Sequence, residues 1–160
     1  MAAKQKITTF LWFDANAEEA VRLYTSIFEG SKVGEIARYG DGGLGPKGSV
    51  MTIRFELQGQ EFIALNGGPQ FKFNEAISLV VNCDTQKEVD DYWSRLSAGG
   101  EEGPCGWLKD RFGLSWQIVP RLLPQLLADP DPQKAKRVVD AMLQMKKLDI
   151  ATLEAAARRP

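Results

Sequence analysis

The same order of secondary structure is predicted twice along the chain, and this recurrence limits the possible folds more than any other feature. In each half, a β-branched and aromatic run predicts a strand, an amphipathic stretch predicts a helix, and shorter alternating runs predict further strands. A shift of 69 positions brings Asn16 onto Thr85 and Tyr24 onto Trp93. The sequence therefore predicts an α+β fold made of two strand–helix–strand–strand–strand units.

In the first half, strands are expected over residues 7–13, 32–39, 50–57 and 61–66. Asn16 stands three residues before Glu19, which is the spacing of a capping box, so a helix is expected to begin there. The loop 43–48 matches G-x-G-x-x-G, but a predicted strand follows it where a dinucleotide-binding motif needs a helix. We interpret it as a hairpin loop.

The second half predicts strands over residues 77–83, 105–110 and 114–119, with a second capping box at Thr85 and Glu88. In the tail, Asp131 is expected to cap a helix with Pro132 at its first position, running to about residue 147. Asp149 is expected to cap a last short helix. The apolar faces of these helices cover either the core of the same chain or a subunit interface, and both remain open.

Composition excludes several classes of function. The chain of 160 residues has no histidine, which excludes a Ser-His-Asp triad, a Cys-His pair and any histidine zinc ligand. A net charge of −1 points to no nucleic acid and to no anionic membrane, and no apolar run approaches the ~20 residues that span a bilayer. The start of the sequence lacks a signal-peptide pattern, so we expect a cytoplasmic location and reduced cysteines.

Three segments carry a resemblance to a known family: LWFDANAEEAVRLYTSIF (11–28), LNGGPQFKF (65–73) and CGWLKDRFGLSWQIVP (105–120). They are similar to the PhnB-like branch of the vicinal oxygen chelate superfamily, which includes glyoxalase I, bleomycin-resistance proteins and extradiol dioxygenases. Members of this branch are often labelled 3-demethylubiquinone-9 3-methyltransferase domain proteins. The tail DPQKAKRVVDAMLQMKKLDIATLEAA resembles the C-terminal extension of the same branch.

The resemblance implies a single domain in which two βαβββ modules form a curved, half-open sheet around a cavity. Module 1 is expected at about 6–68, module 2 at about 75–120, and a C-terminal helical extension at 121–160. The resemblance also implies a homodimer.

The resemblance places metal ligands at three positions, and this chain has lost the usual ligand at each. The matching residues are Thr8-Thr9-Phe10, Ile77-Ser78 and, where the family has a glutamate, Gln117. Hydroxyl and amide groups are weak ligands for transition metals. We therefore expect no metal site and no cofactor, and nothing in the sequence supports methyltransferase activity.

Aromatic residues within the matching segments are the candidates for ligand binding. Strand alternation puts Phe10 and Trp12 on one face of their strand and Leu11 and Phe13 on the other. The predicted ligand-binding set is Phe10, Trp12, Asn66, Phe71, Trp107, Trp116 and Gln117. The alternative is that the aromatic side chains form core and dimer interface.

Three functions from different classes remain open. The leading hypothesis is metal-independent binding of an unknown small molecule in a cavity of a homodimer, as in glyoxalase/bleomycin-resistance-like proteins. The second is an enzyme that uses Cys105, a weak catalytic candidate, or a carboxylate. The third is a protein-interaction module.

Overall fold

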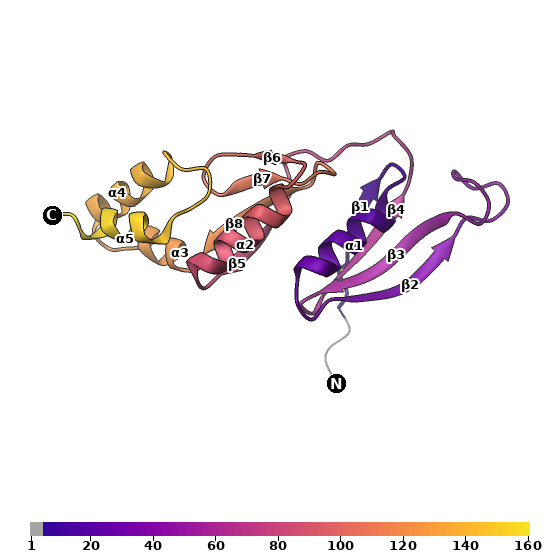
Figure 1. The fold of residues 1–160 in the computed structure, drawn as a ribbon, viewed down its shortest axis with the longest axis horizontal. Helices are drawn as coiled ribbons and strands as arrows, with labels where there is room; N and C mark the ends of the chain where they lie inside the picture. Colours follow the sequence, from indigo (N-terminus) through magenta and orange to yellow (C-terminus); the bar gives the residue numbers. More distant parts are fainter. Residues whose placement is uncertain (1–4) are drawn as a thin grey trace. The chain divides into compact units, whose positions relative to one another are not determined.

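The computed structural model describes residues 5–160, and within them the chain forms eight strands and five helices (Figure 1). Contacts divide the chain into two compact units, of which the first ends at Phe73 and the second spans Asn74–Pro160. Each unit contains one sheet of four strands. The predicted α+β fold is confirmed.

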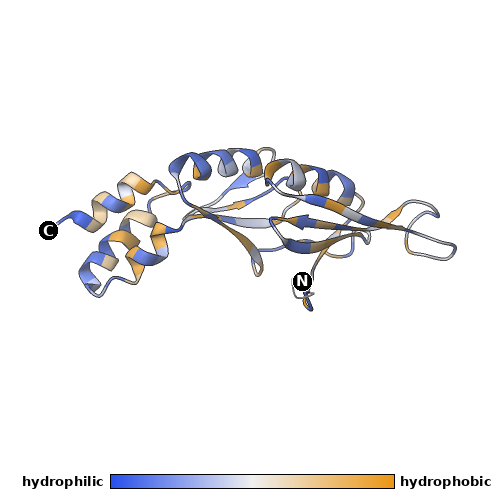
Figure 2. Cartoon of the chain, turned by 90° about the horizontal axis from the view of Figure 1, so that it is seen from below, coloured by the Kyte–Doolittle hydropathy of each residue, from blue (hydrophilic) through white to orange (hydrophobic). Residues whose placement is uncertain are grey.

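In the first unit, one helix covers one face of the sheet. The elements are β1 (Thr9–Phe13), α1 (Ala17–Ile27), β2 (Lys32–Arg38), β3 (Val50–Leu57) and β4 (Gln60–Asn66). The strand order is β1-β4-β3-β2, with β1 parallel to β4 and the other neighbours antiparallel. Figure 2 shows α1 lying along one side of this sheet. The buried layer between them includes Leu11, Phe13, Tyr24, Phe55 and Phe62.

The strands β3 and β4 form a hairpin with a tight turn between them. Gln58 and Gly59 both have positive φ, of 47° and 85°, which is the backbone of a type I′ turn. Such a turn matches the twist of the flanking strands and needs a residue like glycine that adopts positive φ without strain. The loop 43–48 connects β2 to β3, so no helix follows its glycines.

The second unit repeats this topology. Its elements are β5 (Ser78–Cys83), α2 (Gln86–Ser97), β6 (Glu101–Glu102), β7 (Trp107–Lys109) and β8 (Ser115–Pro120), in the strand order β5-β8-β7-β6. The strands β5 and β8 are parallel, as β1 and β4 are. The starts of β1 and β5, and of α1 and α2, are each 69 positions apart along the chain. The predicted internal repeat is therefore present in the fold.

The two predicted capping boxes have different outcomes. The Thr85 hydroxyl accepts a hydrogen bond from the Glu88 amide at 3.2 Å, so that prediction is confirmed. Asn16 is the N-cap residue of α1, so the predicted start of the helix is confirmed, but the predicted capping box is wrong because the Asn16 side chain makes no capping bond. Asn66, at the end of β4, supplies the cap instead, because its Oδ1 accepts from the Ala17 amide at 2.9 Å.

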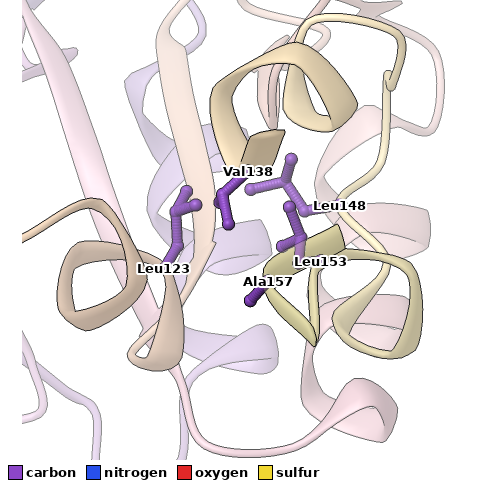
Figure 3. Close-up of a cluster of buried hydrophobic side chains, with 5 residues drawn as sticks. All are labelled: Leu123, Val138, Leu148, Leu153 and Ala157. Carbon is purple, nitrogen blue, oxygen red and sulfur yellow. The ribbon is translucent and has the colours of Figure 1, made fainter. Parts of the chain in front are cut away.

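Three helices follow the second sheet: α3 (Leu122–Leu127), α4 (Pro132–Met142) and α5 (Ile150–Arg158). Asp131 and Asp149 accept hydrogen bonds from Gln133 and Thr152, at 3.0 and 2.7 Å, so both predicted caps are confirmed. The helices enclose an apolar cluster of their own (Figure 3), formed by Leu123, Val138, Leu148, Leu153 and Ala157. None of the helices in residues 5–160 combines the length and apolar composition that crossing a membrane requires.

The predicted extension of α4 to about residue 147 is wrong, because the helix ends at Met142. The Met145 and Lys146 carbonyls accept hydrogen bonds from the Cys105 and Gly106 amides, both at 2.8 Å. The Leu148 carbonyl accepts from the Gln86 side chain at 3.1 Å. Residues 145–148, here called the clamp segment, therefore bond to the loop before β7 and to α2 in place of a continued helix.

Candidate functional site

The helix-free face of the second sheet brings together several predicted residues. In β8, Trp116 and Ile118 are buried on the side that contacts α2, so Ser115 and Gln117 lie on the opposite face. The strand register pairs Ser115 with Lys109, and Gln117 with Trp107. These four side chains therefore share the helix-free face.

A cavity of about 440 Å³ lies at the β6–β7 side of this face. Its lining includes Glu75, Glu101, Pro104, Trp107, Lys109 and Ser115. The volume lies in the range of small-molecule sites, roughly 300–1,000 Å³. Of the predicted ligand-binding residues, Trp107 lines this cavity directly, and Gln117 is its neighbour across the strand pair.

The lining of the cavity contains one buried polar group without a hydrogen-bond partner, the hydroxyl of Ser115. The residue is 1% exposed, and its hydroxyl is the one buried side-chain oxygen or nitrogen within residues 5–160 that has no hydrogen-bond partner. A buried polar group without a partner costs about 1–3 kcal/mol. A bound molecule with a complementary polar atom would remove that cost. No pattern in the sequence pointed to this residue.

The charged side chains around the cavity come from β6, from β7 and from the loop before β5. Lys109 and Glu75 form an ion pair, and their hydrogen bond lowers the pKa of Glu75 and raises the pKa of Lys109. Glu101 lies opposite Lys109 in the β6–β7 register. The neighbouring Glu102 accepts from the Trp93 indole at 3.1 Å, on the side of α2. Glu101 and Glu75 are thus the two carboxylates on the helix-free face beside one ammonium group.

The positions that match metal ligands in the superfamily do not fit a metal ion here. Gln117 donates a hydrogen bond from Nε2 to the Ser78 hydroxyl at 2.9 Å, so two of these side chains bind one another across β5 and β8. Within residues 5–160, no group of three or more His, Cys, Asp and Glu side chains is placed to hold a metal. An amide and a hydroxyl are a poor donor set for a transition metal.

In the first unit, three of the predicted aromatic residues lie on or beside the helix-free face. The Trp12 indole donates to the Gly68 carbonyl at 2.9 Å, and Phe71 packs edge-on against it with ring centroids 4.9 Å apart. A Cβ at Gly67 would lie 2.5 Å from the Trp12 ring, which explains glycine there. Phe10 and Phe71 remain 54% and 63% exposed.

Asn66 and Trp116 have structural partners. Besides capping α1, Asn66 donates from Nδ2 to Glu18 at 2.7 Å and to the Val50 carbonyl at 3.0 Å. The Trp116 indole is 2% exposed and donates to Asp110 at 2.9 Å. These bonds give both side chains a structural role. Their roles in ligand binding stay predictions.

Asp110 is an organising residue whose role the sequence reasoning missed. Its buried carboxylate accepts from the amides of Phe112 and Leu114, at 2.9 and 3.1 Å, and from the Trp116 indole. An Asp and a Gly at the two ends of residues 110–113 are typical of a turn. The bond to the Trp116 indole could not be predicted, because it depends on the register of β8.

The two cysteines are free thiols in different surroundings. Cys83 is fully buried, and burial, followed by the nearby charges of Glu88 and Asp84, raises its pKa to about 12. Cys105 is half-buried with a φ of 57°, and its amide donates to the Met145 carbonyl. Its neighbour Pro104 lines the cavity, and a catalytic role for Cys105 stays a prediction.

Two βαβββ units, each with a helix on one face of its sheet, define the fold of the glyoxalase, bleomycin-resistance and fosfomycin-resistance proteins of the vicinal oxygen chelate superfamily. A family model described as 3-demethylubiquinone-9 3-methyltransferase matches residues 5–119. The PhnB protein of Bacillus cereus, described with the same name, is 39% identical with a TM-score of 0.65, and the match covers 72% of this chain and 99% of that chain. The chain belongs to this PhnB-like 3-demethylubiquinone-9 3-methyltransferase family.

Two more distant structures support the fold alone. A protein from Pseudomonas aeruginosa is 22% identical with a TM-score of 0.61, over 73% of this chain and 98% of that chain. The fosfomycin resistance protein FosX from Mesorhizobium loti is 14% identical with a TM-score of 0.56, over 79% and 99%. No curated protein matches the chain. The helices α3 to α5 lie beyond the family model.

Proposed function

We propose that this protein binds a small organic molecule in the cavity of its second unit, without a metal ion. The observation that carries the proposal is the buried, unpartnered hydroxyl of Ser115 in the lining of a cavity of about 440 Å³. Evolved sites of this kind combine apolar walls with a few convergent polar groups. Here Trp107 and Pro104 supply the apolar wall, while Lys109 and Ser115 supply polar groups.

The bond between Gln117 and Ser78 supports binding without a metal. These side chains stand where the superfamily has ligands, and their polar atoms are already paired at 2.9 Å. A divalent ion would have to break this hydrogen bond and accept two weak donors in exchange.

We also propose that the functional form is a homodimer in the cytoplasm. Exposed apolar side chains on the helix-free faces support a protein partner, since soluble monomers rarely expose large apolar patches. Phe10 in the first unit and Val80 in the second are 54% and 49% exposed.

Native mass spectrometry of freshly purified protein tests the proposal. We expect an assembly of two 17.8 kDa chains that carries an organic adduct and no stoichiometric metal. Trp107→Leu should lose the adduct, whereas Leu143→Ala, which changes an exposed apolar residue away from the cavity, should retain it. One divalent ion per chain, or an adduct retained equally by both variants, would overturn the proposal.

A further inference from the structure

We infer that the ligand of the second-unit cavity is a small organic cation, with an ammonium group and an apolar body. The inference rests on the proposed small-molecule binding and names the class of molecule. The charge of the helix-free face, the aromatic wall and the Ser115 hydroxyl carry it together.

The cavity has an excess of negative charge on the helix-free face. Glu75 and Glu101 contribute two carboxylates there, against the single ammonium group of Lys109. Glu75 pairs directly with Lys109, whereas Glu101 makes no direct ion pair in the part of the chain described, residues 5–160. A cationic ligand would balance Glu101. An anionic ligand would have to displace Glu75 from Lys109 and then lie near the charge of Glu101, which costs free energy.

The wall of the cavity suits a cation that carries an apolar group. Trp107 is half-buried and lines the cavity beside Pro104. The face of an indole ring attracts ammonium groups and also packs against hydrocarbon. A strongly hydrated inorganic cation would use only the carboxylates and would leave this wall without a partner.

Ser115 provides the second polar contact. Its hydroxyl oxygen has lone pairs that can accept from an N–H group, and the hydroxyl is buried without a partner. The strand register places Ser115 directly opposite Lys109, and Lys109 directly opposite Glu101. The Ser115 hydroxyl and the Glu101 carboxylate therefore lie on the same face of the sheet. An ammonium group has three N–H donors and can therefore bond Ser115 and a carboxylate at once.

Three probes of one shape and different charge test the inference: 2-phenylethylamine, 2-phenylethanol and 3-phenylpropionate. Each is titrated into the full-length protein while NMR follows the indole N–H signal of Trp107, assigned with Trp107→Phe. We expect the amine to bind at least about threefold more tightly than the alcohol, the gain of one partly exposed charge pair, and the carboxylate to bind most weakly. Glu101→Gln should abolish the preference for the amine, whereas Glu29→Gln, at an exposed site in the first unit, should leave it unchanged.

Ser115→Ala separates a ligand contact from a structural role. The variant should bind the amine more weakly while its stability to denaturant stays the same or rises, because an unpartnered buried hydroxyl is removed. Equal or tighter binding of the alcohol or carboxylate, or unchanged amine binding by Ser115→Ala, would overturn the inference and leave the proposed function standing. Failure of all three probes to bind at the cavity would overturn both.

Discussion

Asp110 holds the β7–β8 turn through three hydrogen bonds to one buried carboxylate, so the loss of this single side chain should strongly destabilise the fold. Asp110→Ala leaves two amides and the Trp116 indole without their acceptor. We expect a loss of about 3 kcal/mol in the free energy of unfolding, measured by chemical denaturation. Asp41→Ala, which removes only an exposed ion pair with Lys47, should change it by less than about 0.5 kcal/mol. A loss of the same size in both variants would contradict this role for Asp110.

The buried thiol of Cys83 should make the free energy of unfolding depend on pH in the alkaline range. Burial raises its folded-state pKa from 9.0 to about 12, so between these values unfolding releases a proton. The stabilisation that comes from keeping the Cys83 thiol protonated is complete below pH 9.0. As the pH rises towards 12, the free energy of unfolding falls by up to about 1.4 kcal/mol per pH unit. Denaturation across this window should show a shallower fall for Cys83→Ala than for the unchanged protein. Parallel falls would show that Cys83 does not contribute.

At the scale of elements, the clamp segment ties the C-terminal helices to the second sheet. Gln86 donates to the carbonyl of Leu148, the last residue of this segment, at 3.1 Å and accepts from the amide of Ile150, the first residue of α5, at 2.8 Å. Gln86→Ala should therefore lower the free energy of unfolding by about 1–2 kcal/mol. Gln133→Ala, at an exposed position in α4, serves as the control and should be neutral. Equal stability of the two variants would contradict the importance of the clamp segment.

The neighbouring strands β5 and β8 allow the expected lack of a metal site to be tested directly. The side chains of Ser78 and Gln117 lie within hydrogen-bond distance of one another. The double substitution Ser78→His and Gln117→Glu should create measurable Co²⁺ binding, since imidazole and carboxylate are better ligands than hydroxyl and amide. Calorimetry and the visible spectrum of Co²⁺ provide the readout. Equal Co²⁺ binding by the unchanged protein would contradict our account of these positions.

Elements that carry their own hydrophobic pattern could be predicted from the sequence. The alternation from Val50 to Leu57 predicted β3 with the bounds that the structure has. The strand β6 contains only Glu101 and Glu102, and two acidic residues have no periodicity to detect. The cap of α1 was missed because its acceptor, Asn66, lies far along the chain and comes near only when the sheet forms. Local signals therefore predicted elements, and tertiary contacts decided their ends.

At the scale of the whole molecule, the repeat and the family could be predicted, and the site only in part. The 69-residue shift and the resemblance of three segments indicated the two units that the structure contains. Trp107 was predicted and lines the cavity, but Ser115, Lys109 and Glu101 were not. Their side chains meet through strand register, which a single sequence does not reveal because a slip of one residue reverses every face.

Binding of an organic molecule without a metal ion can be seen in a crystal structure of protein purified without added metal, with anomalous data collected for transition metals. We expect density for an organic molecule in the cavity within hydrogen-bond distance of the Ser115 hydroxyl, with Gln117 still bonded to Ser78. A metal ion between Ser78 and Gln117 would contradict it. So would a cavity in which Ser115 bonds only to the protein's own side chains.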